Sequence, residues 1–192
     1  MKTVTGLYDD YAAAKAAVAE LETAGIPSSD ISIVSHHSDK ETNAAEGAGV
    51  GAGIGAAVGG AGGLLAGLGI MAIPGVGPVV AAGWLAATLA GAVGGAVVGG
   101  AAGGLIGAFT EAGVPDEDAH LYAEGVRRGG TVVTAKVPDE RYTEADGILS
   151  SANRVNLVER RRIYNEEGWR RFDAEDDPYT VDEIERERSR YL

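Results

Sequence analysis

The chain has 192 residues, a net charge of −12 at pH 7 and no cysteine. The missing cysteine excludes disulfide bridges and thiolate sites, and the strong negative charge argues against a general nucleic-acid-binding protein. The length suits one or two domains. The N-terminal sequence MKTVTGLYDDY lacks the apolar run of a signal peptide, so we expect a cytoplasmic protein.

The N-terminal residues predict one β-α-β unit. Residues 3–8 read as a short strand, and Asp9 or Asp10 caps the helix that follows. Gly25 ends that helix, and a turn leads to a second strand over residues 31–35. The helix has one apolar face, made of Ala14, Ala17, Val18 and Leu21.

The middle of the chain, residues 47–110, contains no charged residue and is very rich in glycine. PGVGP at 74–78 would break any helix, so we expect two helices in a hairpin, each with a groove of glycines. Gly83 and Ala87 extend the second groove backwards. Glycine recurs at every fourth position in two rows, Gly47, Gly51, Gly55, Gly59, Gly63 and Gly67, then Gly91, Gly95, Gly99, Gly103 and Gly107.

Glycine costs about 1 kcal/mol per helical position relative to alanine, so these helices make sense only if another backbone packs into the groove. This arrangement is a glycine zipper, and the glycines of the two rows are our candidate helix-packing and oligomer-interface residues. The alternative is a disordered Gly/Ala-rich segment. Bulky residues such as Leu64, Trp84 and Leu105 favour the helices, because a flexible linker would carry serine and charge instead.

The part of the chain after the glycine block predicts the rest of a sheet. Gly129-Gly130 stops the first of two further helices, and Asn153 is the C-terminal cap of the second. We expect helices over 115–128 and from Pro138 onward, and strands over 131–137 and 154–159. The apolar faces of the two helices are Ala119, Tyr122, Ala123 and Val126, and Ala145, Ile148, Leu149 and Ala152.

These elements predict an α+β fold, with a small ferredoxin-like (ACT-like) sheet in the order βαβ-αβαβ and helices on one face. The glycine hairpin is inserted between strands two and three, which we expect to be antiparallel neighbours with Ser35 and Thr131 at adjacent ends. The predicted organisation is 1–46 for the first half of the sheet and a polar linker, 47–110 for the hairpin, 111–159 for the second half, and 160–192 for a charged tail.

Three stretches in this order resemble the bacterial general stress proteins of the YflT (heat-induced stress protein) type. They are TVTGLYDDYAAAKAAVAELETAGIPSSDISIVS, the Gly/Ala block with PGVGP, and GVPDEDAHLYAEGVRRGGTVVTAKV. The resemblance covers roughly residues 1–160. It implies a stress-associated protein without an established enzymatic activity, and it supplies no catalytic residues.

The tail, residues 160–192, combines a basic block, an acidic block and several aromatic side chains. TVDE at 180–183 predicts a capping box for a final charged helix. Aromatic residues beside opposite charge blocks suggest docking on a neighbour, with Trp169 and Phe172 as the tail anchors. The alternative is a solvated and partly disordered end.

Two possible sites are rejected on the sequence. His36 and His37 with Asp39 would hold a metal only weakly, because adjacent histidines in an extended loop point in opposite directions and His120 lies on another helix. GLGIMA at 67–72 matches a dinucleotide-binding pattern by letters, but it ends at a proline instead of opening a helix. We therefore expect neither a metal site nor a cofactor.

The Arg160–Arg162 triplet could contact phosphate, but with Glu159, Glu166 and Glu167 nearby it fits a charged interface better. No Ser/His/Asp set has support in the sequence. We expect no enzyme, no catalytic residues, no nucleic-acid partner and no small-molecule substrate.

Three functions remain open. The leading one is a non-catalytic stress-response protein that assembles with itself through the glycine rows. The second is a membrane-associated protein whose hairpin enters the bilayer, which the length of each arm permits but the lack of flanking basic residues disfavours. The third, an ACT-like small-ligand sensor, rests on fold analogy alone.

Overall fold

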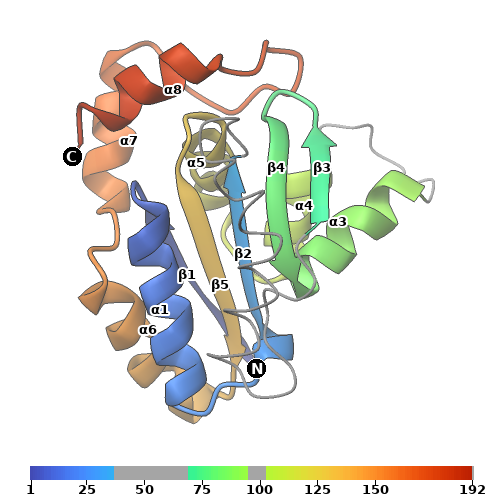
Figure 1. Cartoon of the computed structure of the whole chain (residues 1–192), viewed down its shortest axis with the longest axis vertical. Helices are drawn as coiled ribbons and strands as arrows, with labels where there is room; N and C mark the ends of the chain where they lie inside the picture. The colour runs from blue at the N-terminus through green and yellow to red at the C-terminus, as the bar shows by residue number, and fades with distance from the viewer. Residues whose placement is uncertain (37–68, 95–102, 192) are drawn as a thin grey trace.

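A computed structural model describes residues 1–36, 69–94 and 103–191. Its five strands form one antiparallel sheet in the order β1-β5-β2-β4-β3 (Figure 1). The strands are β1 (Lys2–Tyr8), β2 (Ile31–His36), β3 (Gly69–Ile73), β4 (Gly77–Gly83) and β5 (Thr131–Val137). The helices are α1 (Tyr11–Thr23), α3 (Trp84–Gly94), α4 (Gly103–Glu111), α5 (Asp116–Arg127), α6 (Tyr142–Ser151), α7 (Leu157–Glu166) and α8 (Val181–Arg188), with short 3₁₀ turns at Ser28–Asp30 and Asp139–Arg141.

The first β-α-β unit forms as the sequence predicts. Asp10 caps α1, since its carboxylate accepts a hydrogen bond from the N–H of Ala12 at 3.0 Å. Gly25 follows the helix with a φ of +85°, and the N–H of Ile26 donates to the carbonyl of Leu21 at 3.0 Å. The predicted apolar face of α1, Ala14, Ala17, Val18 and Leu21, is buried.

β5 lies between β1 and β2 and pairs antiparallel with both. The predicted antiparallel pairing of strands two and three is confirmed, and Ser35 is the partner of Thr131 at their adjoining ends. α5 and α6 also form where the sequence predicts, and Asn153 adopts a φ of +62° just after α6. The two predicted helix faces contact the core, with Ala119, Tyr122, Ala123, Val126, Ala145 and Leu149 buried and Ile148 and Ala152 packed against them.

Helices cover both faces of the sheet, whereas the sequence analysis placed them on one face only. α1 and α6 pack on one face, in a cluster that contains Val4, Tyr8, Ile33 and Val133. α3, α4 and α5 pack on the other face, over Leu7, Val34, Val79, Ala81 and Val132. The second layer is needed because the central strands carry apolar side chains on both faces.

The glycine block does not form two helices over the described residues, and this prediction is wrong for residues 69–83. They form the β3–β4 hairpin, which extends the sheet beyond β2 (Figure 1). Pro74 and Gly75 make its turn: Gly75 has a φ of +72°, and the N–H of Val76 donates to the carbonyl of Ile73 at 3.1 Å. Proline followed by a glycine with positive φ is the signature of a type II turn.

The glycine rows lie mostly outside the described residues, and no glycine zipper is seen in the described part of the chain. Gly83 ends β4 with a φ of +84°, so the second row does not extend backwards as a helix. No described helix is both long and apolar enough to cross a lipid bilayer. Gly47, Gly51, Gly55, Gly59, Gly63, Gly67, Gly95 and Gly99 are outside the described ranges, whereas Gly91 lies in α3 and Gly103 and Gly107 lie in α4.

The predicted fourth strand at 154–159 is also wrong, because the chain turns into α7 there. Asn156 caps α7, and its side chain accepts hydrogen bonds from the N–H groups of Val158 and Glu159 at 3.0 and 3.2 Å. The strand-like pairing is limited to the N–H of Val155, which donates to the carbonyl of Leu7 at 2.8 Å. The sheet therefore lacks the fourth strand of a ferredoxin-like fold, and β1 is an edge strand.

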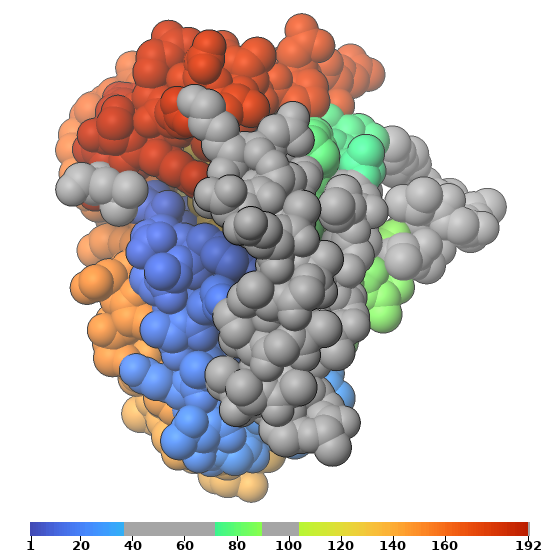
Figure 2. Space-filling view, viewed as in Figure 1, coloured from blue at the N-terminus to red at the C-terminus, as the bar shows by residue number. Residues whose placement is uncertain are grey.

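The tail folds onto its own chain and caps one end of the sheet, where it is drawn in orange and red (Figures 1 and 2). The predicted capping box of α8 is present between Thr180 and Glu183. Tyr164 and Ile184 are almost fully buried, and the tail anchor Phe172 joins the core cluster under α3, α4 and α5. The described tail is thus an ordered part of the fold and not a solvated end.

Candidate functional site

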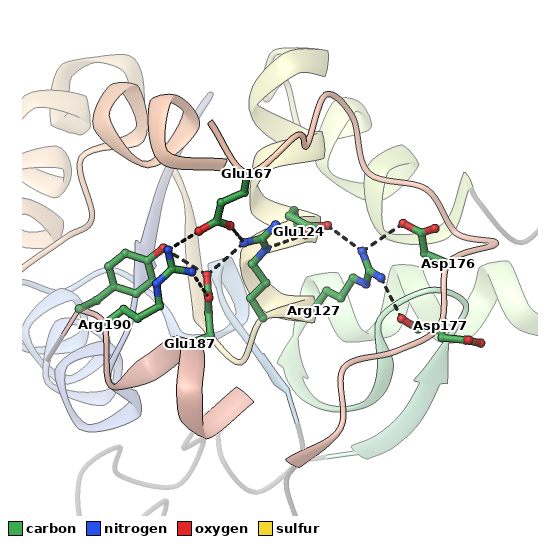
Figure 3. Close-up of polar contacts among 9 residues, drawn as sticks. Glu124, Arg127, Glu167, Asp176, Asp177, Glu187 and Arg190 are labelled. Carbon is green, nitrogen blue, oxygen red and sulfur yellow. Dashed lines mark hydrogen bonds and ion pairs between the residues drawn. The ribbon is translucent and has the colours of Figure 1, made fainter. Parts of the chain in front are cut away.

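Arg128 is the centre of a polar network that holds the tail against the end of α5. Figure 3 shows the carboxylates of Glu124, Glu167 and Glu187 in this network. The Nε of Arg128 donates to Glu124 Oε1 at 2.6 Å, and its Nη1 donates to Glu167 Oε2 at 2.5 Å and to Glu187 Oε1 at 3.1 Å. The guanidinium also stacks 3.9 Å from the ring centroid of Tyr164. One side chain therefore joins α5, the end of α7 and α8.

Hydrogen bonds within the network stabilise the charged forms of Arg128 and Glu167. Burial opposes the charged form of Arg128, but its hydrogen bonds to Glu124 and Glu167 outweigh this and raise its pKa. Burial likewise opposes ionised Glu167, and the bonds from Arg128 and Arg190 outweigh it and lower the pKa of that carboxyl. Arg127 extends the network by donating to Asp176 Oδ2 at 3.2 Å. Arg128 and Glu167 therefore both stay charged at neutral pH.

The Arg160–Arg162 triplet lies in charged contacts within the chain. Arg160 donates twice to Asp9, at 2.8 and 2.6 Å, and its guanidinium stacks 3.7 Å from the ring centroid of Tyr191. Arg161 donates to Asp118 at 2.6 Å. Arg162 pairs with Glu159 and Glu166 on the surface of α7. The charged interface expected from the sequence is thus formed by α7 with its own domain.

Glycine turns allow the tail to approach the domain closely. A Cβ on Gly129, which has a φ of +93°, would lie 2.3 Å from Cγ2 of Ile184. A Cβ on Gly75 would lie 2.7 Å from the backbone of Ala174. At both positions, glycine therefore allows the positive φ of the turn and also the close approach of the tail.

His120 lies on α5 under the tail and is buried, with its Nε2 3.8 Å from Asp116 Oδ1. Burial lowers its pKa, and the positive charge of Arg171 lowers it further, while Asp116 and the backbone of Phe172 act in the opposite direction. The imidazole is therefore neutral at pH 7.

A groove of about 1010 Å³ follows the outer edge of β1. Its lining includes Thr3 and Thr5 of β1, Tyr122 of α5, and Asp146 and Ser150 of α6. Arg154 also lines it, and donates to Asp146 at 2.6 Å and to the carbonyl of Thr5 at 3.5 Å. The groove was not predicted from the sequence, because the strand expected over residues 154–159 would have occupied this edge of the sheet.

The residues considered as metal ligands are not brought together in the described part of the chain. His36 ends β2, His120 lies on α5, and His37 and Asp39 are outside the described ranges. Within residues 1–36, 69–94 and 103–191, no three His, Cys, Asp or Glu side chains form a metal-binding group. The described part of GLGIMA lies in β3, a strand.

The tail anchors differ in burial. Phe172 is 7% exposed, whereas Trp169 is only partly buried and packs edge-on against Tyr164, with ring centroids 5.8 Å apart. Their contacts lie within the chain. A role in assembly remains a prediction.

A family model described as the heat-induced stress protein YflT domain matches residues 3–71. The resemblance stated from the sequence is confirmed over that range, which runs from β1 into β3. Searches of curated proteins and of solved structures found no significant match.

Proposed function

We propose that this chain is a non-catalytic stress-response protein that assembles with itself through the glycine-bearing surface of its helices. The match of residues 3–71 to a heat-induced stress protein domain supports the stress role. The observation that supports assembly is the open space over the glycines of α4.

α4 has two different faces. Leu105, Ala108 and Phe109 are buried against the sheet. Gly104 and Gly107 lie three residues apart on another face, and a Cβ at either would meet nothing within 4 Å. Each glycine costs the helix about 1 kcal/mol relative to alanine, and packing within the described chain does not explain that cost. The close approach of a neighbouring subunit would explain it.

The buried charges support a structural role instead of catalysis. Arg128 is bonded to Glu124, and Arg160 to Asp9. These groups hold the tail in place, so they are already engaged. We accordingly propose no cofactor, no metal, no nucleic-acid partner and no small-molecule substrate, and we place the protein in the cytoplasm with other copies of itself as its partner.

The test is the mass of the full-length protein in sedimentation velocity without detergent. Gly104→Leu and Gly107→Leu should lower the mass of the assembly, because a leucine side chain would occupy the space of the neighbour. Gly147→Leu is the matched control, since Gly147 is a helical glycine on α6 that also has nothing within 4 Å. All three changes should raise helix propensity equally.

A parent protein that is monomeric at micromolar concentration would overturn the proposal. So would α4 variants that assemble as well as the Gly147→Leu control. Recovery of the parent only in the membrane fraction, with release by detergent, would instead favour the bilayer-inserted alternative.

A further inference from the structure

The segment between α7 and α8 runs along α5 without forming a helix or a strand (Figure 1). We call residues 169–180 of this segment the strap. At its start, Arg171 Nη2 lies 3.3 Å from Asp116 Oδ2 in the first turn of α5. Near its end, Arg127 Nη2 in the last turn of α5 donates to the carbonyl of Asp177 at 2.8 Å (Figure 3). The strap therefore follows the helix from one end to the other.

Phe172 fixes the strap to the core. Its side chain is 7% exposed and belongs to the cluster that α3, α4 and α5 form on the sheet. Further along, a Cβ on Gly75 would lie 2.7 Å from the Cα of Ala174, so the strap also touches the β3–β4 turn. Undocking of the strap would uncover both contacts.

His120 is buried beneath the start of the strap. Its side chain is 8% exposed, and neither ring nitrogen has a hydrogen-bond partner within the described part of the chain. Its Nε2 lies 3.8 Å from Asp116 Oδ1, whereas the other oxygen of the same carboxylate faces Arg171. The imidazole and the arginine of the strap thus share a single carboxylate.

The other charged groups around α5 are paired elsewhere or exposed. Glu124 binds Arg128, Arg161 of α7 binds Asp118 and Glu117, Lys136 of β5 stacks on Trp84, and Glu111 of α4 is exposed. His36 of β2 lies near the other end of the strap, because a Cβ on Gly77 would be 3.4 Å from its Nε2 and 3.0 Å from the Cβ of Pro178. Asp116 and Arg171 are therefore the charges that act on His120.

We propose that the strap is an acid-sensitive latch, which protonation of His120 shifts from its docked position on α5 toward an undocked one. A proton on His120 places a second cation next to Arg171, at a site from which water is largely excluded. The two cations then compete for the carboxylate of Asp116. Undocking relieves this conflict, because it hydrates the imidazolium and carries Arg171 away. The latch does not depend on assembly through α4.

The direction of the coupling follows from the proton affinity of His120 in the two positions. While the strap is docked, burial lowers the pKa of His120 below 6.5 and Arg171 lowers it further, against the opposing effects of Asp116 and of the backbone of Phe172. Undocking exposes the imidazole and returns its pKa toward 6.5. Docking is therefore strongest above pH 6.5 and weakens as the pH falls toward the lower pKa of the docked form. Each pKa unit of this difference raises the undocked fraction by at most about tenfold.

The test is limited proteolysis of the full-length protein by thermolysin at pH 5 and at pH 7.5, with the cleavage sites identified by mass spectrometry. Thermolysin cleaves before large apolar residues, so undocking should expose the bond before Phe172. The acid response is the cleavage rate of the strap at pH 5 divided by that at pH 7.5. His120→Gln keeps a polar side chain that does not titrate, and it cancels the pH dependence of the protease. The acid response of the parent should be at least about threefold larger than that of His120→Gln.

Two further variants should move the acid response in opposite directions. Arg171→Gln removes the competing cation and should lower it, whereas Asp116→Asn removes the shared carboxylate and should raise it. Arg170→Gln is the matched control, because Arg170 is exposed and donates only to the backbone carbonyls of Asn165 and Trp169. Its acid response should equal that of the parent. A strap that was merely held by these side chains would not give responses of opposite sign.

Three results would overturn the proposal. Equal acid responses of the parent and of His120→Gln would point to another group, such as His36. Cleavage at pH 5 that spreads over the helices of the domain would show unfolding of the whole chain instead of local undocking. If His120→Gln is unfolded by circular dichroism, the other two variants decide: acid responses of Arg171→Gln and Asp116→Asn on the same side of the parent contradict the latch.

Discussion

Ser35 and Thr131 face each other across the β2–β5 ladder with their hydroxyl oxygens 2.9 Å apart, although they lie 96 positions apart in the sequence. The described part of the segment between them includes β3 and β4, which extend the same sheet, and helices that supply one layer of the core. The described residues of this segment are therefore part of the same fold as β2 and β5.

The first prediction concerns this layer. Leu85→Ala on α3 and Phe109→Ala on α4 should lower the free energy of unfolding by about 2–5 and 3–5 kcal/mol, because both side chains are fully buried against the sheet. Urea denaturation measures the loss. Val158→Ala, at a side chain that is 80% exposed, should change stability by no more than about 0.5 kcal/mol. Equal effects at all three sites would show that the layer is not packed as described.

The second prediction concerns the centre of the tail network. Arg128→Ala should destabilise the protein by up to about 3–5 kcal/mol, because it takes one cationic partner from each of the buried carboxylates of Glu124 and Glu187, which are then left with Arg127 and Arg190. Limited proteolysis should then cleave the tail faster. Arg162→Ala removes an exposed arginine that pairs only within α7, and should leave both measurements nearly unchanged. A stable Arg128→Ala protein with a protected tail would contradict the role of the network.

The third prediction separates backbone strain from close contact at Gly129. Alanine at Gly129 or at Gly25 pays the same penalty for a positive φ, about 1–2 kcal/mol. Only at Gly129 would the added Cβ also overlap a side chain, that of Ile184 on α8, whereas Gly25 has nothing within 4 Å. Gly129→Ala should therefore lose a further 1–3 kcal/mol, roughly, in thermal or urea unfolding. Identical losses would mean that α8 does not rest on this turn.

The fourth prediction concerns pH. Burial and Arg171 lower the pKa of His120 below its ordinary value of 6.5, so the unfolded chain binds a proton more readily than the folded chain. This contribution to stability is fully present above pH 6.5 and is lost as the pH falls through the lower pKa of the folded state. The free energy of unfolding of the parent should thus drop below pH 6.5, and His120→Gln should flatten that part of the curve. Parallel curves for the two proteins between pH 5 and 7 would refute the assignment.

Local signals in the sequence predicted the first half of the sheet well. The cap at Asp10, the glycine at position 25 and the spacing of the apolar residues each act within one helical turn, so neighbouring residues are enough to define α1. The antiparallel pairing of β2 with β5, with Ser35 and Thr131 at adjoining ends, was also predicted from the order of the elements.

The two elements that were predicted wrongly, at 69–83 and 154–159, carry sequence signals for more than one kind of secondary structure. The glycine spacing through residues 69–83 suggested a helix, yet Pro74-Gly75 already carried the signature of a type II turn. RVNLVE at 154–159 alternates like a strand, but Asn156 is a strong helix cap, and the bonds of Arg160 to Asp9 fix α7 in place. The latter contact spans the whole domain and has no local signature.

The tail network could not have been predicted as a site. The capping box at Thr180 and the glycine pair after α5 can be recognised in the sequence. The contact between α8 and this glycine pair depends on how α8 crosses the end of the sheet. The groove along β1 could not be predicted either, because the strand expected over residues 154–159 would have occupied it, and the chain forms α7 there instead.

The order of the strands shows which strands of the stretch matched by the family model pair with one another. That stretch, residues 3–71, includes β1 and β2 and the start of β3, but in the sheet β5 separates β1 from β2, and β4 separates β2 from β3. In the sheet of the described residues, none of these three strands pairs with another of the three. The boundary drawn by sequence similarity therefore does not coincide with the pairing of the sheet: β1, β2 and β3 are joined by β4 and β5, which the later part of the chain supplies.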